Sequence, residues 1–253
     1  MNTILISLSS FGAAEVGRHG QLWFARLAQQ AGADGFEVRG ELMRDGEAEL
    51  VAIAAALPDM ERVYSSPDGL WDVDGHLDHT ALERGLSAAR ALGSSRLKMS
   101  IGGYRADAVT SLPVLGQWIE RAGIELVIEN DQTESAGTLN ALVRFFEAAD
   151  ARGLKLGMTF DIGNWHWVGE CPLQAAATLA SRVCYVHCKG VQRLPNRWVA
   201  VPLGESAAPW RAILRTQPAN RSWAIEYPLV GDDLLAVTQR EVAQLRSVAG
   251  SMA

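Results

Sequence analysis

Short apolar runs of strand length alternate with longer amphipathic stretches along the whole chain, and this alternation limits the possible folds more than any other feature. The apolar runs cover residues 4–8, 35–38, 62–65, 97–101, 125–129, 156–161, 183–187 and 224–227. Helical patterns cover residues 21–31, 47–57, 80–92, 111–121, 139–151, 173–179, 209–215 and 233–248. Alternating strands and helices are typical of βαβ units and a parallel sheet.

Eight such units in 253 residues match the size of a (β/α)₈ barrel. A doubly wound open sheet is the competing architecture, but it usually has fewer units, and no GxGxxG motif follows any of the apolar runs. The chain contains no linker, low-complexity tract or repeated period. We therefore predict an α/β fold, a (β/α)₈ TIM barrel, with residues 1–253 forming a single domain.

The composition narrows the class of partner and the compartment. The net charge is −6 and no basic run is longer than two residues, which argues against nucleic acid and anionic membranes as partners. The three cysteines form no CxxC pair, the first residues lack a basic segment, and the longest apolar run (51–57) is too short to cross a bilayer. We expect a cytoplasmic protein that binds a small molecule, and homo-oligomerisation stays open.

Four apolar runs in the second half of the chain end on a side chain that binds hard metal ions. The runs read LVIEN, MTFDIGN, VCYVHC and WAIEYP, and the side chains are Glu129, Asp161, His187 and Glu226. The C-terminal ends of barrel strands share one rim, so these four residues are expected to converge. Three carboxylates and an imidazole suit one divalent metal ion, with Mn²⁺ favoured and Mg²⁺, Co²⁺ or Zn²⁺ as alternatives.

Each of these residues taken alone is also compatible with a loop position or a helix cap. Burying a lone carboxylate costs several kcal/mol, however, and a shared cation would compensate all three. In VCYVHC, His187 lies on the opposite face from Cys184 and Cys188, so both cysteines are expected to be small buried apolar groups facing the helices.

Other polar residues have two interpretations each. Glu37 and Arg39 share a strand face, so they either line the site opposite the metal or form a structural ion pair. Lys98 lies within an apolar run and either reaches an internal carboxylate or substrate oxygen, or extends to solvent. His166 lies between two tryptophans just after Asp161, and this segment either stacks on a sugar or packs its own loop.

The strand-end residues and the phrases around them resemble a known family. ENDQT, TFDIGNW, VHCKGV, VPLGE and IEYPL are similar, in order, to signatures of the sugar phosphate isomerase/epimerase family with the xylose-isomerase-like TIM barrel. The likeness is most specific from residue 124 to residue 229, and the nearest subgroup is linked to 2-ketogluconate utilisation. It implies that Glu129 and Glu226 bind the metal and move protons, and that Arg193, six residues after His187, holds substrate oxygens.

Two positions depart from the family epimerases. Asn164 stands where they have a histidine, and Ser135 stands where they have a glutamate. Both positions concern substrate recognition, so we expect Asn164 to contact substrate, and the departures argue against a free ketose. The predicted substrate-binding residues are therefore Arg193, Asn164, Lys98, Glu37 and His166.

We predict a metal-dependent isomerase or epimerase that acts on a small keto-sugar or keto-sugar acid through an enediolate intermediate. The alternative is a dehydratase with a keto-inositol-like substrate, using the same barrel and metal site. Related barrels that cleave DNA at abasic sites need several more histidines than the five present here. A sugar-binding module without catalysis is the remaining alternative.

Overall fold

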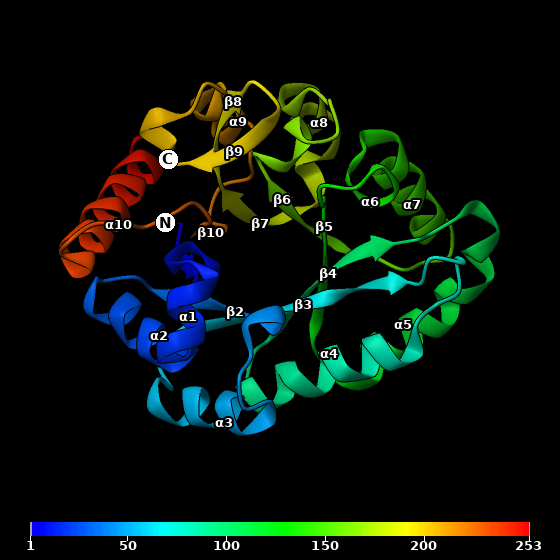
Figure 1. Ribbon diagram of the computed structural model, residues 1–253. Helices are drawn as coiled ribbons and strands as arrows, with labels where there is room; N and C mark the ends of the chain where they lie inside the picture. Colours follow the sequence, from blue (N-terminus) through cyan, green and yellow to red (C-terminus); the bar gives the residue numbers. More distant parts are fainter. Residues whose placement is uncertain (1, 253) are drawn as a thin grey trace.

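Eight parallel strands close into a barrel in the order β1-β10-β7-β6-β5-β4-β3-β2 (Figure 1). The structure is a computed structural model that describes residues 2–252. The barrel strands are β1 (Ile4–Ser7), β2 (Gly35–Arg39), β3 (Glu61–Trp71), β4 (Arg96–Gly102), β5 (Glu125–Glu129), β6 (Gly157–Asp161), β7 (Val183–Cys188) and β10 (Ser222–Ile225). Each contains residues of one predicted apolar run, which confirms the predicted (β/α)₈ barrel.

The strands are apolar because both of their faces are buried, one against the helices and one inside the barrel. In β1, Ile4 and Ile6 pack in the large core beneath the helices, whereas Leu5 points into the barrel. Leu5 packs there with Val63, Tyr185 and Ala224, which come from three other strands. This small inner cluster closes the barrel below the rim where the strands end.

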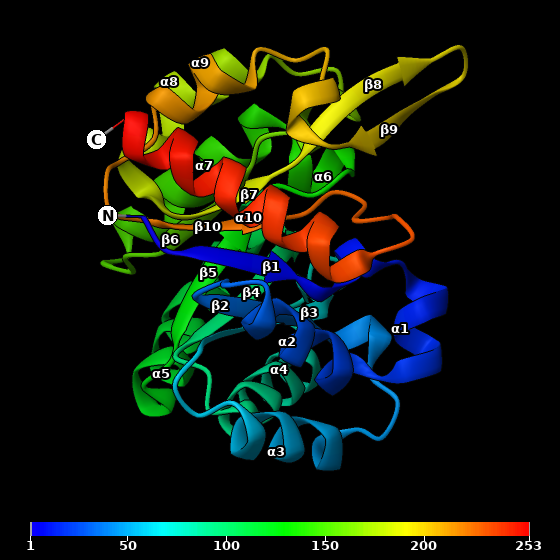
Figure 2. The same ribbon diagram turned by 90° about the vertical axis from the view of Figure 1, so that its left-hand side faces the viewer.

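Helices surround the barrel on its outside (Figures 1 and 2). Within residues 2–252 they are α1 (Ala13–His19), α2 (Gln21–Gln30), α3 (Glu47–Ala56), α4 (His79–Leu92), α5 (Leu112–Ala122), α6 (Glu134–Gly137), α7 (Leu139–Ala151), α8 (Pro172–Leu179), α9 (Trp210–Arg215) and α10 (Leu234–Ser251). Several begin with a polar cap, such as Asp78, whose side chain accepts a hydrogen bond from the Ala81 amide. No helix among residues 2–252 has the length and apolarity needed to cross a membrane.

The structure adds elements that the pattern of runs does not predict. An antiparallel hairpin, β8 (Gly190–Leu194) and β9 (Arg197–Val201), follows β7 and projects away from the barrel (Figure 2). Strand β3 continues to Trp71, well beyond the predicted end at residue 65, after an irregularity between Ser65 and Gly69. Both additions lie beyond the C-terminal ends of the strands, so they extend the walls of the barrel mouth.

Candidate metal centre

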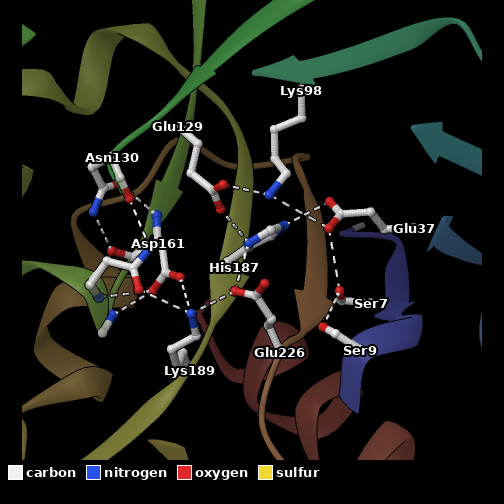
Figure 3. Close-up of polar contacts among 12 residues, drawn as sticks. Ser7, Ser9, Glu37, Lys98, Glu129, Asn130, Asp161, His187, Lys189 and Glu226 are labelled. Carbon is white, nitrogen blue, oxygen red and sulfur yellow. Dashed lines mark hydrogen bonds and ion pairs between the residues drawn. The ribbon is translucent and has the colours of Figure 1, made fainter. Parts of the chain in front are cut away.

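The four predicted ligands converge at the C-terminal rim of the barrel. Glu129 ends β5, Asp161 ends β6, His187 lies in β7, and Glu226 directly follows β10. Each offers one ligand atom, and these atoms all lie within 4.8 Å of one another (Figure 3). Strand pairing produces this arrangement, because Asp161 is in register with His187, and the Glu226 amide donates to the Cys188 carbonyl at 3.1 Å.

Each ligand side chain turns one atom toward the other three, and we call these four atoms the inner atoms. They are Glu129 Oε1, Asp161 Oδ2, His187 Nδ1 and Glu226 Oε2. His187 Nδ1 lies 2.8 Å from the inner oxygen of Glu129 and 2.9 Å from that of Glu226. Three carboxylate oxygens and a ring nitrogen therefore face a common point.

The second atom of each ligand is held by a different group, which we call its outer partner. Lys98 Nζ donates to Glu129 Oε2 at 2.5 Å, and Arg39 donates to Glu226 Oε1 at 2.6 Å. His187 Nε2 lies 2.8 Å from Glu37 Oε2. Asp161 Oδ1 accepts hydrogen bonds from the backbone amides of residues 163 and 164, at 2.8 and 3.1 Å. The outer partners leave one atom of each side chain turned toward the other three, as single-atom coordination requires.

The inner atoms fit a divalent cation. Within residues 2–252, His187 Nδ1 and Glu226 Oε2 are buried and form no hydrogen bond of acceptable geometry, despite their close charged neighbours. Buried polar atoms without partners are costly, and three carboxylates in one place repel one another. A shared cation with oxygen and nitrogen ligands at about 2.0–2.3 Å would relieve both costs.

The electrostatics keep most of the carboxylates ionised. Burial raises the pKa of Glu129, but the nearby charges of Lys98 and His187 outweigh it and lower this pKa to about 2. The pKa of Glu226 is likewise well below its usual range, because His187 and Lys189 outweigh burial. Asp161 differs, since burial is the dominant effect and raises its pKa to about 6. His187 has a pKa well above its usual value, despite burial, because Glu226 and Glu37 stabilise its charged form.

Lys189 also belongs to this cluster, although the sequence interpretation does not include it. Its ammonium lies 2.6 Å from Asp161 Oδ2 and 2.9 Å from Glu226 Oε2. Gly163 makes room for it, because a Cβ at that position would lie 2.9 Å from Lys189 Cγ. The signal was present in VHCK, where residue 189 is two positions after His187 and so continues the same strand face.

Glu37, Lys98 and Asn164 lie beside the ligands. Glu37 and Lys98 are almost completely buried inside the barrel mouth, at 0% and 1% exposed. Lys98 thus reaches an internal carboxylate rather than solvent. Asn164 accepts a hydrogen bond from Lys189 Nζ at 3.0 Å and donates to the backbone of Asn130 at 2.9 Å. Asn164 is buried, so it supports Lys189 from within the protein.

Arg193 and His166 lie at the hairpin rather than among the ligands. Arg193 is exposed on β8 and its guanidinium lies over the Trp198 ring, 5.4 Å from the centroid. The His166 ring packs against the same tryptophan, with centroids 4.8 Å apart. Trp165 is fully buried against Phe160, so it packs its own loop and does not form the sugar-stacking wall that was one interpretation of this segment.

Two cavities open at the C-terminal side of the barrel. One, of about 270 Å³, is lined by Lys189 and Glu226 together with Ser9, Ser10 and Tyr227. The other, of about 610 Å³, lies between the C-terminal ends of β3 and β4 and the segment after β5, which includes Ser135 of α6. Both have room for a small molecule, and the first contains two members of the charged cluster in its wall.

The chain belongs to the xylose isomerase-like TIM barrel family, whose model matches residues 25–220. Among solved structures it is similar to an L-ribulose 3-epimerase, with a TM-score of 0.71 and 16% identity over 100% of this chain and 96% of the other. It is also similar to the apo form of 3-keto-D-glucoside 4-epimerase from E. coli, with a TM-score of 0.66 and 18% identity over 98% and 100% of the two chains.

A third similar structure is the probable 3-DHS dehydratase AsbF from Bacillus anthracis, involved in petrobactin synthesis. Its TM-score is 0.69, at 16% identity over 97% of this chain and 99% of the other. No curated protein sequence matches the chain. At these identities the solved structures establish the fold, and the chemistry has to be argued from the site itself.

Proposed function

We propose that this protein is a divalent-metal-dependent isomerase or epimerase acting on a small keto-sugar or keto-sugar acid through an enediolate intermediate. The observation that carries the proposal is the set of four inner atoms, which face one another while an outer partner holds the second atom of each side chain. Mn²⁺ is the ion we propose, because three carboxylates and one imidazole suit it. Two of the similar solved structures are named as sugar epimerases, which agrees with this proposal.

A divalent cation at this site would polarise the substrate carbonyl and stabilise the negative charge that develops on deprotonation. Glu129 and Glu226 are the proton carriers we propose. Both are kept ionised by neighbouring cations, as a proton acceptor must be. If the two glutamates act on opposite faces of the substrate, a stereocentre inverts, and if the proton returns to the adjacent carbon, an aldose and a ketose interconvert.

The cations at the mouth favour an acidic substrate within this class. Lys189 lines the cavity of about 270 Å³ beside Glu226, so a substrate held there lies against an ammonium group. Arg39 is 17% exposed and reaches the same glutamate. A keto-sugar acid presents the carboxylate that these two side chains can pair with. The departures at Asn164 and Ser135 agree with a substrate other than a free ketose.

A dehydratase acting on a keto-inositol-like compound is the second candidate. The observation that favours it is again Lys189, because an ammonium beside the proton-accepting Glu226 can donate a proton to a departing hydroxyl group. One of the similar solved structures is named as a probable dehydratase. Both candidates begin with removal of a proton next to a carbonyl, and they differ in whether a hydroxyl then leaves.

The test is a screen of keto-sugars and keto-sugar acids in D₂O with Mn²⁺, followed by proton NMR. We expect the α-proton signal of one compound to disappear, while the signals of an epimer or isomer appear. Exchange accompanied by new alkene signals would assign the dehydratase instead. Tight sugar binding without exchange, with or without Mn²⁺, would refute both enzymes and indicate a binding module.

We place the reaction in the cytoplasm, since all three cysteines are free.

A further inference from the structure

Glu37 occupies an unusual position for a carboxylate that is not one of the four ligands. It is fully buried inside the barrel on β2 and has polar neighbours from three other strands. Its Oε2 lies 2.8 Å from His187 Nε2. Its Oε1 accepts hydrogen bonds from Ser7 and Arg39, both at 3.3 Å, and lies 3.7 Å from Lys98 Nζ. A buried carboxylate without partners would be costly, so these contacts compensate for its burial.

The contacts of Glu37 link the outer partners of the metal ligands to one another. Lys98 is the outer partner of Glu129, and Arg39 is the outer partner of Glu226. Glu37 touches both of these cations and is itself the outer partner of His187. Three of the four ligands are therefore connected through one side chain, and Figure 3 shows the links through His187 and Lys98. Asp161 is independent of it, because backbone amides hold its outer oxygen.

The contact between Glu37 and His187 also decides which ring nitrogen is free. The Glu37 carboxylate lies within hydrogen-bond distance of His187 Nε2, at 2.8 Å, and a carboxylate accepts such a bond, so Nε2 carries the proton that His187 donates. The neutral tautomer then has its lone pair on Nδ1, which is the inner atom. Carboxylates that accept from the distal nitrogen of a metal-ligating histidine fix the ring in this way.

We propose that Glu37 is the positioning residue of the metal centre: it fixes His187 as an Nδ1 ligand and, through Lys98 and Arg39, keeps Glu129 and Glu226 as single-oxygen ligands. This inference rests on the proposed metal site. Without the Glu37 carboxylate, the imidazole can rotate, and Lys98 and Arg39 keep only the ligand carboxylates as buried anionic partners. Each glutamate can then shift and present both oxygens to a cation.

Two substitutions separate the roles of Glu37. Glu37→Leu removes every polar contact while keeping an apolar side chain of similar size. Glu37→Gln keeps an oxygen that can accept from His187 Nε2 but loses the charge that pairs with Lys98 and Arg39. The matched control is Glu61→Gln, which removes a carboxylate charge from the ion pair with Arg96 at the opposite end of the same barrel.

The measurements are Mn²⁺ affinity by calorimetry and the d–d absorption spectrum of bound Co²⁺, which reports coordination number and geometry. For Glu37→Leu we expect Mn²⁺ affinity to fall about 10–100-fold, the usual effect of losing such a partner. For Glu37→Gln we expect a smaller loss of affinity together with a changed Co²⁺ spectrum. Glu61→Gln should match the unsubstituted protein in both measurements.

The outcomes distinguish this inference from the proposed function. If the unsubstituted protein binds neither Mn²⁺ nor Co²⁺, the metal site itself is wrong and the role of Glu37 is refuted with it. If the unsubstituted protein binds metal and both Glu37 variants keep its affinity and Co²⁺ spectrum, only the positioning role is wrong. Circular dichroism checks folding, and if Glu37→Leu does not fold, the Glu37→Gln spectrum alone decides.

Discussion

The two ends of the barrel both carry ion pairs, but they are built differently. At the N-terminal end, Arg96 lies 2.8 Å from Glu125 and 3.5 Å from Glu61, and Glu61 also accepts hydrogen bonds from the hydroxyls of Thr3 and Ser222. The side chain of Glu61 remains 31% exposed and that of Glu125 46% exposed. At the mouth, the four ligands and Glu37 are at most 15% exposed.

The difference supports our proposal that the network at the mouth is the functional site. The N-terminal network links strand starts and lets its carboxylates keep contact with water, so its purpose can be structural. The mouth concentrates like charges where desolvation is most expensive and leaves their inner atoms facing one another. A network of buried charges is weak evidence for stability. Groups with shifted pKa values gathered at one rim are typical of functional sites. In TIM barrels the active site lies at the C-terminal rim.

The largest expected effect comes from the proton carriers at the mouth. Glu129→Gln and Glu226→Gln each keep an oxygen ligand but remove a base, so the chemical step should slow by about 10²–10⁴-fold. Metal binding should survive, and each variant should retain exchange from one substrate epimer more than from the other. Single-turnover exchange in D₂O measures the rates. If both variants exchanged the substrate α-proton at the wild-type rate, another residue would have to transfer the proton. The candidates would then be Lys98, Glu37 and His166.

The next effect concerns the hairpin wall of the mouth. A hydrogen bond to a charged group contributes about 1.5–3 kcal/mol, so Arg193→Ala should raise KM about 10–100-fold while leaving metal affinity unchanged. Arg197→Ala is the matched control, because the strand register puts Arg193 with Trp198 on one face and Arg197 with Leu194 on the other. Equal effects of the two substitutions on KM would show that Arg193 has no specific contact with substrate.

A substitution at the N-terminal end should have the opposite profile. Arg96→Met leaves Glu61 and Glu125 without their cation, and an unpaired, partly buried charged group costs about 1–3 kcal/mol. We expect the free energy of unfolding, measured by urea denaturation, to fall by this amount with kcat/KM unchanged. If catalysis fell along with stability, the separation between the two ends of the barrel would be incorrect.

The sequence predicts the convergence of the four rim residues well and their surroundings poorly, for a physical reason. Glu129 and Asp161 end apolar runs, and strand periodicity and barrel symmetry then place them on one rim. Lys189 lies beyond the end of its run, and its contact with Asp161 depends on the space left at Gly163. The link from Glu37 to His187 spans β2 and β7, and such a contact depends on barrel closure rather than on any local pattern.

The hairpin was missed because its strands are not buried like those of the barrel. Residues 190–201 mix polar and apolar residues around a Pro-Asn pair, which is typical of a turn, but they contain no buried apolar run. The long end of β3 was missed for a similar reason, since Pro67 and Gly69 ordinarily terminate a strand. Here the proline lies at the irregularity in the ladder, and a Cβ at Gly69 would lie 2.7 Å from Gly102 Cα, so close pairing with β4 requires glycine.

The smallest effect tests whether every carboxylate near the mouth belongs to the site. Asp78 lines the cavity of about 610 Å³, yet its side chain accepts from the Ala81 amide at 2.8 Å and caps α4. Replacing such a cap with alanine costs about 1 kcal/mol. Asp78→Ala should therefore lower the free energy of unfolding by that amount and leave KM, kcat and metal affinity as they are. Asp78→Asn should restore the stability, because asparagine caps helices as well as aspartate does. Asparagine keeps the cap and removes only the charge. A rise in KM in both variants would therefore show that the substrate site extends across the mouth to the loop after β3.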